Sequence, residues 1–192
     1  MIPTIIHNPR SIRHNHLIAQ LESQGITEYD FSDPVYGPDA KLAVAQAHVN
    51  AAKQSLERHG YCFVMENDIV FTHKDSTNYF LSKFKELPDD WDVYLMGYYY
   101  SNRDAKKVGT FKSLRSFTAF HGYILNPRII DRMMPHKGSQ VTNIDVYLSH
   151  IGARIYAIDP VVAIQNHDFV SERLGGVKKY QSTIAKLNKY NG

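Results

Sequence analysis

Apolar residues fall into two kinds of segment along this chain, short continuous runs and longer stretches with helical spacing. Continuous runs predict buried strands, and they cover residues 4–6, 26–31, 61–65, 91–96, 117–125 and 154–162. Helical spacing recurs over residues 11–24, 40–59, 77–85, 127–134, 143–151 and, in a Lys-rich form, 176–190, while the polar stretch 101–110 predicts a loop. Gly25 and Gly60 end the first two helical stretches and are typical of C-caps. Because strands and helices alternate, the pattern predicts an α/β fold with a mainly parallel central sheet flanked by helices.

Length and composition narrow the class of protein. The 192 residues suit a single domain spanning 1–192, with a core that forms without disulfides, and a lone Cys62 excludes an intramolecular disulfide or a multi-cysteine zinc site. A net charge of +3 without a long basic run argues against a nucleic-acid partner. The 13 tyrosines suit a pocket for a sugar or a nucleobase, and an aromatic-rich core explains them equally well.

The apolar runs of this sequence do not suggest a secretory signal or a membrane span. The first apolar run is short and is interrupted by Pro3, so it does not resemble a secretory signal. No run reaches the roughly 18 apolar residues of a membrane span. We therefore expect a soluble, intracellular protein with a cytoplasmic location and no membrane span.

An acidic step follows the apolar strand predicted at 61–65. Glu66 and Asp68 are separated by Asn67, and on an extended backbone alternate side chains project to the same side. Two such carboxylates offer oxygen ligands to a divalent cation, whose other positions take the oxygens of a diphosphate. A solvated turn or a helix N-cap is the alternative interpretation of the same residues.

Further segments accompany this step in a specific order. They are residues 5–10 with Arg13, 46–49, 64–69, 87–93, 120–125, 143–145 and 160–165. In this order and spacing, the chain resembles the family 25 glycosyltransferases, which comprise the lipooligosaccharide galactosyltransferases of bacteria and the collagen galactosyltransferase group. It departs from them at Asn67, where the family has Asp, and at Ala47, where it has Ser. The chain also resembles the capsid-decorating glycosyltransferase domains of large algal viruses (chloroviruses), which would place it in the host cytoplasm.

The resemblance implies a fold, a reaction and a cation. It implies one GT-A (Rossmann-like) domain that transfers a sugar from a nucleotide-sugar donor, UDP-linked, to a hydroxyl of a glycan or glycoprotein acceptor with inversion. Mn²⁺ or Mg²⁺ would be held by Asp68 as the principal ligand. Glu66 would face the ribose or bind the metal through water, and His167 would be a further metal ligand, since imidazole suits Mn²⁺.

The resemblance also implies roles on the nucleotide side. Asn8, Arg10 and Arg13 follow the first strand, where GT-A folds hold the base and the phosphates, and an arginine fork suits phosphate. An exposed helix start is the alternative for these three residues. His48 would reach the donor diphosphate, or it is a buried, hydrogen-bonded helix histidine.

Acceptor-side roles fall on carboxylates and tyrosines. Asp145 is the candidate general base for the acceptor hydroxyl, with Asp92 in reserve. A carboxylate in the first turn of a helix, which satisfies backbone N–H groups, is the alternative role for Asp145. The tyrosines at 98–100 would stack on a sugar ring or pack at the edge of the core.

Two other functions use similar features. A metal-dependent nucleotidyltransferase or phosphohydrolase would use the same acidic step, but it would normally carry a Gly-rich phosphate loop where this chain has Asn8-Pro9-Arg10. A non-catalytic module that binds a nucleotide sugar or a glycan is the second alternative. Such a lectin has no reason to require both UDP and Mn²⁺.

Overall fold

The computed structural model describes residues 1–99, 105–136, 139–141, 143–166 and 168–169. A central eight-stranded sheet has the order β2-β1-β3-β8-β5-β9-β7-β6. Its strands are β1 (Thr4–Ile6), β2 (Asp30–Ser32), β3 (Cys62–Glu66), β5 (Val93–Leu95), β6 (Lys106–Val108), β7 (Phe111–Leu114), β8 (Gly122–Leu125) and β9 (Ile155–Ile158). β7 and β8 run opposite to the other strands of this sheet.

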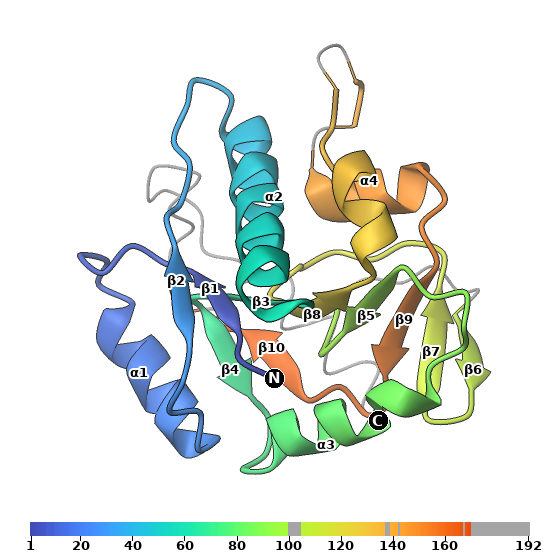
Figure 1. The fold of residues 1–192 in the computed structure, drawn as a ribbon, viewed down its shortest axis with the longest axis horizontal. Coiled ribbons are helices and arrows are strands. Elements are labelled where there is room, and N and C mark those ends of the chain that lie inside the picture. The colour runs from blue at the N-terminus through green and yellow to red at the C-terminus, as the bar shows by residue number, and fades with distance from the viewer. Residues whose placement is uncertain (100–104, 137–138, 142, 167, 170–192) are drawn as a thin grey trace.

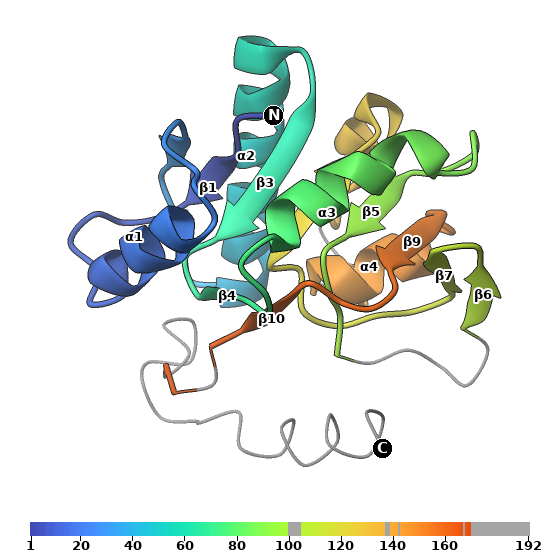
Figure 2. The same cartoon turned by 90° about the horizontal axis from the view of Figure 1, so that it is seen from below.

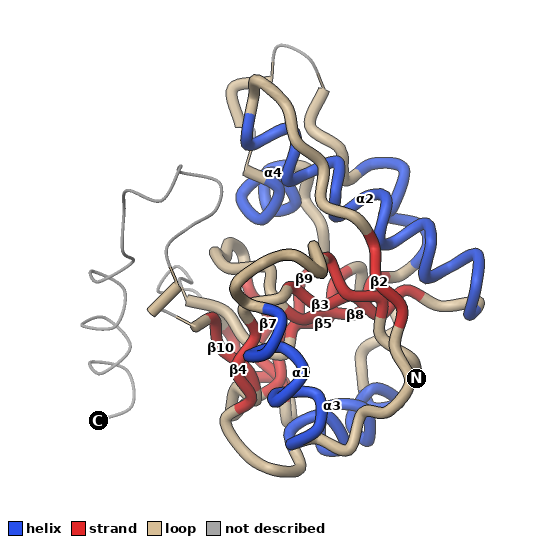
Figure 3. Tube along the Cα trace, turned by 90° about the vertical axis from the view of Figure 1, so that its left-hand side faces the viewer, coloured by secondary structure: helices blue, strands red, loops and turns tan. Residues whose placement is uncertain are grey.

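Helices cover both faces of the sheet, as Figure 3 shows from the side. They are α1 (His14–Ser23), α2 (Ala40–His59), α3 (Ser76–Lys83) and α4 (Ile144–His150), with the 3₁₀ helices η1 (Phe84–Glu86) and η2 (Pro127–Arg132). The expected α/β class with a mainly parallel, helix-flanked sheet is confirmed. Within the described ranges, no helix combines the length and the apolar character that crossing a membrane requires.

Two hydrophobic cores lie on the two faces of the sheet. In β3, Cys62 and Val64 belong to the core shared with α2, α4 and η2, whereas Phe63 and Met65 belong to the core shared with α1 and α3. All four side chains are fully buried. A strand covered on both faces needs this near-continuous apolar run, because successive side chains point to opposite faces.

The long helix α2 agrees with its predicted bounds. Asp39 is its N-cap and accepts hydrogen bonds from the backbone N–H groups of Lys41 and Leu42, at 2.9 and 3.1 Å. Gly60 ends the helix in the left-handed region at φ 73°, which a residue without Cβ adopts at little cost. Gly25 follows α1 with φ 66° in the same way.

Several elements differ from the prediction. Residues 127–132 form a 3₁₀ helix, β2 is confined to 30–32, and β8 begins only at Gly122. Part of the stretch predicted as a loop, 106–108, forms β6 and pairs with β7 across Gly109, where φ is 59°. The short strand β4 (Ile69–Phe71) was not predicted, and it pairs antiparallel with β10 (Ala163–Gln165) in a separate small sheet (Figure 2). The Lys-rich tail at 176–190 lies outside the described residues.

The order of connections creates a switch point between β1 and β3. From β1 the chain passes through α1 to β2 on one side, and it then returns through α2 to β3 on the other side of β1 (Figure 1). Helices α1 and α2 lie on opposite faces of the sheet. In open α/β sheets, ligands bind where the strand order reverses, beyond the carboxyl ends of the strands. The fold therefore points to the segments that follow β1 and β3.

Candidate functional site

A cavity of about 500 Å³ lies at this switch point. Its walls come from the segments after β1, β2, β3, β5 and β10, from α2, and from the segments that lead into β8 and α4. The predicted site residues that line it are Asn8, Arg13, His48, Glu66, Asp68 and Asp145. The structure thus brings together side chains that are up to 137 positions apart in the sequence, from Asn8 to Asp145 (145 − 8).

The two carboxylates of the acidic step face different partners. The sequence predicts that Glu66 and Asp68 project to the same side of an extended backbone. Strand β3 instead ends at Glu66, and residues 67 and 68 form a turn into β4. Both carboxylates still line the cavity, but Glu66 contacts helix α2 and Asp68 contacts the start of α1.

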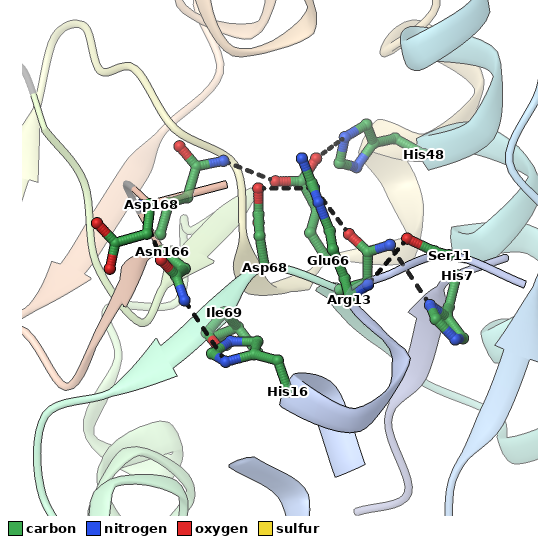
Figure 4. A network of polar contacts seen from close by, with 12 residues as sticks. His7, Ser11, Arg13, His16, His48, Glu66, Asp68, Ile69, Asn166 and Asp168 are labelled. Carbon is green, nitrogen blue, oxygen red and sulfur yellow. Dashed lines mark hydrogen bonds and ion pairs between the residues drawn. The ribbon is translucent and has the colours of Figure 1, made fainter. Parts of the chain in front are cut away.

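Arg13 and Asp68 form a nearly buried ion pair at the cavity (Figure 4). Nη1 of Arg13 lies 3.1 Å from Oδ2 of Asp68, and the two side chains are 8% and 15% exposed. The same Nη1 donates to Oδ1 of Asn67 at 3.0 Å. The guanidinium lies 5.2 Å from the ring centroid of Phe169, within cation–π range. Asn67, which the sequence analysis noted only as a departure, is therefore a buried polar partner of Arg13.

Glu66 is held from two sides. Its Oε1 lies 3.2 Å from Nε2 of His48, and its Oε2 accepts from Nε2 of Gln165 at 3.0 Å. Burial raises the pKa of Glu66, but the hydrogen bond and charge of His48, with His121 and Gln165 also contributing, hold that pKa below its ordinary value. Glu66 is therefore ionised near neutral pH.

A buried tyrosine orients His48 from behind. Tyr123 Oη lies 2.7 Å from Nδ1 of His48, and burial keeps the pKa of Tyr123 well above its ordinary value. Because ionised Glu66 only accepts hydrogen bonds, Nε2 of His48 must donate to it. The other ring nitrogen, Nδ1, faces the protonated phenol of Tyr123, so both nitrogens of His48 have a hydrogen-bond partner. Of the two expectations for His48, the buried and hydrogen-bonded role describes its present contacts, and His48 also lines the cavity.

Asp145 lies in the first turn of α4, at the wall of the cavity. Its Oδ1 accepts from the N–H of Val146 at 2.8 Å, and its Oδ2 accepts from the N–H of Ala119 at 3.1 Å. Ala119 has φ 74°, an uncommon conformation for a residue with a Cβ, and it lines the same cavity. Burial raises the pKa of Asp145, with Glu66 adding to the shift and the two N–H groups opposing it. The carboxylate is thus both fixed in place and less acidic than usual.

The remaining predicted residues lie in different places. Asn8 accepts from the N–H of Arg10 at 2.9 Å, but Arg10 is exposed and does not line the cavity. Tyr99 lines the cavity, and its hydroxyl is bonded to the backbone of Gln165, whereas Tyr98 packs against the core. His167 and Tyr100 lie outside the described residues.

Asp92 lies at the amino ends of the strands, away from the cavity at their carboxyl ends, so its prediction as a reserve base is not retained. It precedes β5, and its Oδ1 accepts from Nε of Arg128 at 2.7 Å while its Oδ2 accepts from the N–H of Arg154 at 2.8 Å. It does not line the cavity. Strand β5 runs parallel to β9 and in the same direction as β3, so the residue before it lies at the amino ends of the strands.

Gln165 enters the site through packing that local sequence patterns do not reveal. Strand β10 lies against the chain after β5, where the N–H of Val162 donates to the carbonyl of Met96 at 2.9 Å. At Gly97 a Cβ would overlap the carbonyl of Ala163, so this close approach requires glycine. The signal available in the sequence is therefore Gly97, but its partner is 66 residues away (163 − 97).

The side chains that could hold a divalent cation at this cavity are carboxylates. Mg²⁺ and similar hard cations retain waters and often use one or two carboxylates plus substrate phosphates. Asp68 supplies one such carboxylate at the cavity. Among the described residues, no group of three or more His, Cys, Asp or Glu gathers into a cage for a metal ion.

The comparisons with known proteins give information about the fold of this chain. No family model and no curated protein matches the chain. Among the solved structures that match is "Crystal Structure of A197 from STIV", a viral protein with a TM-score of 0.57 and 20% sequence identity, where the match covers 86% of each chain. At this level of identity, the likeness describes a shared mixed α/β fold over most of both chains.

Proposed function

We propose that this protein is a GT-A-type glycosyltransferase that moves a sugar from a UDP-linked donor to a hydroxyl of a glycan or glycoprotein. The observation that carries the proposal is the Arg13–Asp68 ion pair beside ionised Glu66, in a cavity at the switch point of the sheet. A nucleotide-sugar leaving group is a diphosphate, which needs a cationic partner on the protein and a carboxylate for its divalent cation. The resemblance to the family 25 glycosyltransferases supports the same function.

Donor binding is assigned to the α1 side of the cavity. Arg13 donates to the diphosphate oxygens, because a guanidinium offers parallel N–H groups to phosphate. Asp68 holds Mn²⁺ or Mg²⁺, which neutralises charge on the departing diphosphate when bound. Glu66, oriented by His48 and Gln165, accepts a hydrogen bond from a ribose hydroxyl. Asn8 lies on the same wall and offers its amide to the nucleotide.

Acceptor activation is assigned to Asp145. Its carboxylate accepts the proton of the acceptor hydroxyl as the acceptor oxygen bonds to the anomeric carbon and the bond to the diphosphate breaks. A raised pKa suits this task, because a base works best when its pKa lies near the working pH. The two backbone N–H groups fix the direction of the carboxylate. Transfer from the face opposite the leaving group gives inversion.

The alternative of a nucleotidyltransferase or phosphohydrolase receives no comparable support. Residues 7–13, between β1 and α1, contain no glycine, so they cannot form the Gly-rich loop that cradles phosphates in many such enzymes.

Isothermal titration with UDP, with and without Mn²⁺, tests the proposal, followed by a screen of nucleotide sugars for metal-dependent transfer or hydrolysis. We expect UDP to bind in the presence of Mn²⁺, and Asp68→Asn to abolish that binding while the fold is retained. Asp75→Asn is the matched control, since Asp75 is an exposed acid before α3 that makes no capping hydrogen bond. Equal binding of UDP–Mn²⁺ by the parent and by Asp68→Asn would refute the site assignment.

A further inference from the structure

Arg13 is paired with the carboxylate of Asp68, which is the group proposed to bind the divalent cation. Its Nη1 lies 3.1 Å from Oδ2 of Asp68, so the oxygen proposed to bind a cation already faces a positive charge. Arg13 also lines the cavity and belongs to the proposed diphosphate site. One guanidinium thus stands between the two parts of the donor complex, the cation and the diphosphate.

A cation that arrives alone meets two obstacles. It is repelled by the guanidinium, and at this separation the repulsion is strong because the pair is largely removed from water. If the cation displaces Arg13 from Asp68, the guanidinium keeps a charge in a place where its residue is only 6% exposed. Removing one partner of a buried ion pair is costly, since the other charge is left uncompensated. Binding of the free metal ion is therefore disfavoured.

A diphosphate removes both obstacles. It offers the guanidinium a second anion with which arginine makes strong, charge-assisted hydrogen bonds. Arg13 can turn toward it without losing every present contact, because the same Nη1 also donates to Oδ1 of Asn67 at 3.0 Å. Asp68 is then available to the cation, and the negative diphosphate attracts that cation as well.

We infer that Arg13 acts as a latch on Asp68, so that the divalent cation binds only when a diphosphate draws the guanidinium away. This inference rests on the proposed nucleotide-sugar site and adds the order in which its parts assemble. The coupling is reciprocal, because an effector that changes the affinity for a second ligand is itself affected by the same factor. Metal and nucleotide therefore enter as a unit, and the protein without a nucleotide resists loading by cations.

Titration of Mn²⁺ alone, followed by electron paramagnetic resonance, is the decisive measurement. Diphosphate oxygens bind the cation themselves, so cooperativity in the parent protein does not isolate the role of Arg13. We expect Arg13→Gln to bind Mn²⁺ alone at least about tenfold more tightly than the parent, within the usual range of coupling between sites. Arg10→Gln makes the same change of charge three positions away at an exposed site, and we expect it to change this affinity less than about twofold. Asp68→Asn should lose Mn²⁺ binding in every background.

A second measurement reads the response of the parent protein, and variants serve only to assign its signals. In ¹⁵N spectra of the arginine side chains, we expect UDP with Mg²⁺ to shift the Arg13 guanidinium signal, and Mg²⁺ alone to leave it unchanged. Assignment follows from spectra of Arg10→Gln and of the other arginine variants. An Arg13 signal that stays in place when UDP–Mg²⁺ binds overturns the latch.

The remaining outcomes separate the latch from the proposed function. If Arg13→Gln binds Mn²⁺ alone no more tightly than the parent, while UDP–Mn²⁺ binding still requires Asp68, the latch is wrong and the proposed function stands. If the parent binds no UDP in the presence of Mn²⁺, the proposed function is wrong, and so is the inferred coupling between metal and nucleotide.

Discussion

Replacing Asp145 by Asn separates two roles for this carboxylate. In the structure it accepts hydrogen bonds from the N–H groups of Val146 and Ala119, and it lines the proposed acceptor side of the cavity. As a general base, Asp145 takes the proton of the acceptor hydroxyl. As a structural clamp, it holds Ala119 in place and so maintains the shape of the cavity wall. Asp145→Asn removes the base and one of the two acceptor oxygens while nearly preserving the volume of the side chain.

The structure sets the size of both effects. Losing one hydrogen bond to a charged group costs about 1.5–3 kcal/mol. For a chain of this length, each kcal/mol lowers the melting temperature by about 2–4 °C, so we expect a drop of about 3–12 °C. The lower end is favoured, because burial already disfavours the charged carboxylate. Loss of a general base reduces transfer by about 10²–10⁴-fold, while donor affinity stays nearly unchanged.

A second substitution distinguishes the two roles. Ala119 has φ 74°, and the left-handed region costs an L-residue about 1–2 kcal/mol that glycine does not incur. Ala119→Gly should therefore hold the turn without help from Asp145. We expect the double variant Asp145→Asn with Ala119→Gly to regain part of the lost melting temperature and none of the lost transfer.

Melting temperature and transfer rate, measured on the same preparations, give the answer. If transfer recovers in the double variant together with stability, Asp145 is a clamp and not a base. If Asp145→Asn alone stays fully active per folded molecule, inverting transfer through this residue is refuted, and a retaining mechanism becomes the better hypothesis. Ala119→Gly alone serves as the control for changes in the wall itself.

Further predictions concern the donor side, the pH dependence and the packing behind the site. Arg13→Ala should weaken UDP by about 10–100-fold more than uridine, since a charge-assisted bond is worth about 1.5–3 kcal/mol, and equal losses in calorimetry would show that Arg13 does not contact phosphate. Because the folded pKa of Asp145 is raised above the ordinary 3.8, its contribution to stability is full below that pH and is lost as pH rises through the folded pKa. Urea unfolding should accordingly show the parent losing stability relative to Asp145→Asn as the pH rises from about 4, and a difference that grows in the opposite direction contradicts the shift. Gly97→Ala should cost about 1–3 kcal/mol or more, because its Cβ would overlap the carbonyl of Ala163, and an unchanged melting curve would show that β10 adjusts freely.

Local patterns in the sequence predicted much of the framework. The apolar spacing, Asp39 and Gly60 define α2, because periodicity and capping depend on residues a few positions apart. The apolar run before Glu66 predicted a strand at the centre of the sheet, buried on both faces, and the structure confirms it. The same local logic placed Asp68 and Arg13 just after strands, where ligands of α/β folds gather.

Local patterns did not predict the short or distant pairings. Strands β4 and β10 have three residues each, and each is stabilised by a partner about 90 positions away, so no local pattern reveals that they pair. Strand β8 enters antiparallel between β3 and β5, a placement that depends on how the whole sheet is assembled.

By itself, the sequence determined the α/β class, the long helix and the position of the acidic step at the end of a strand. Only the tertiary structure decided what each carboxylate contacts. The turn at residues 67 and 68 directs Asp68 to Arg13, while Glu66 is held by His48. Asp92 lies at the amino ends of the strands and pairs with Arg128 there. The physical reason is that a strand or helix follows from neighbouring residues, whereas an ion pair requires side chains from distant segments to be packed at one place. For Arg13 and Asp68 that separation is 55 residues.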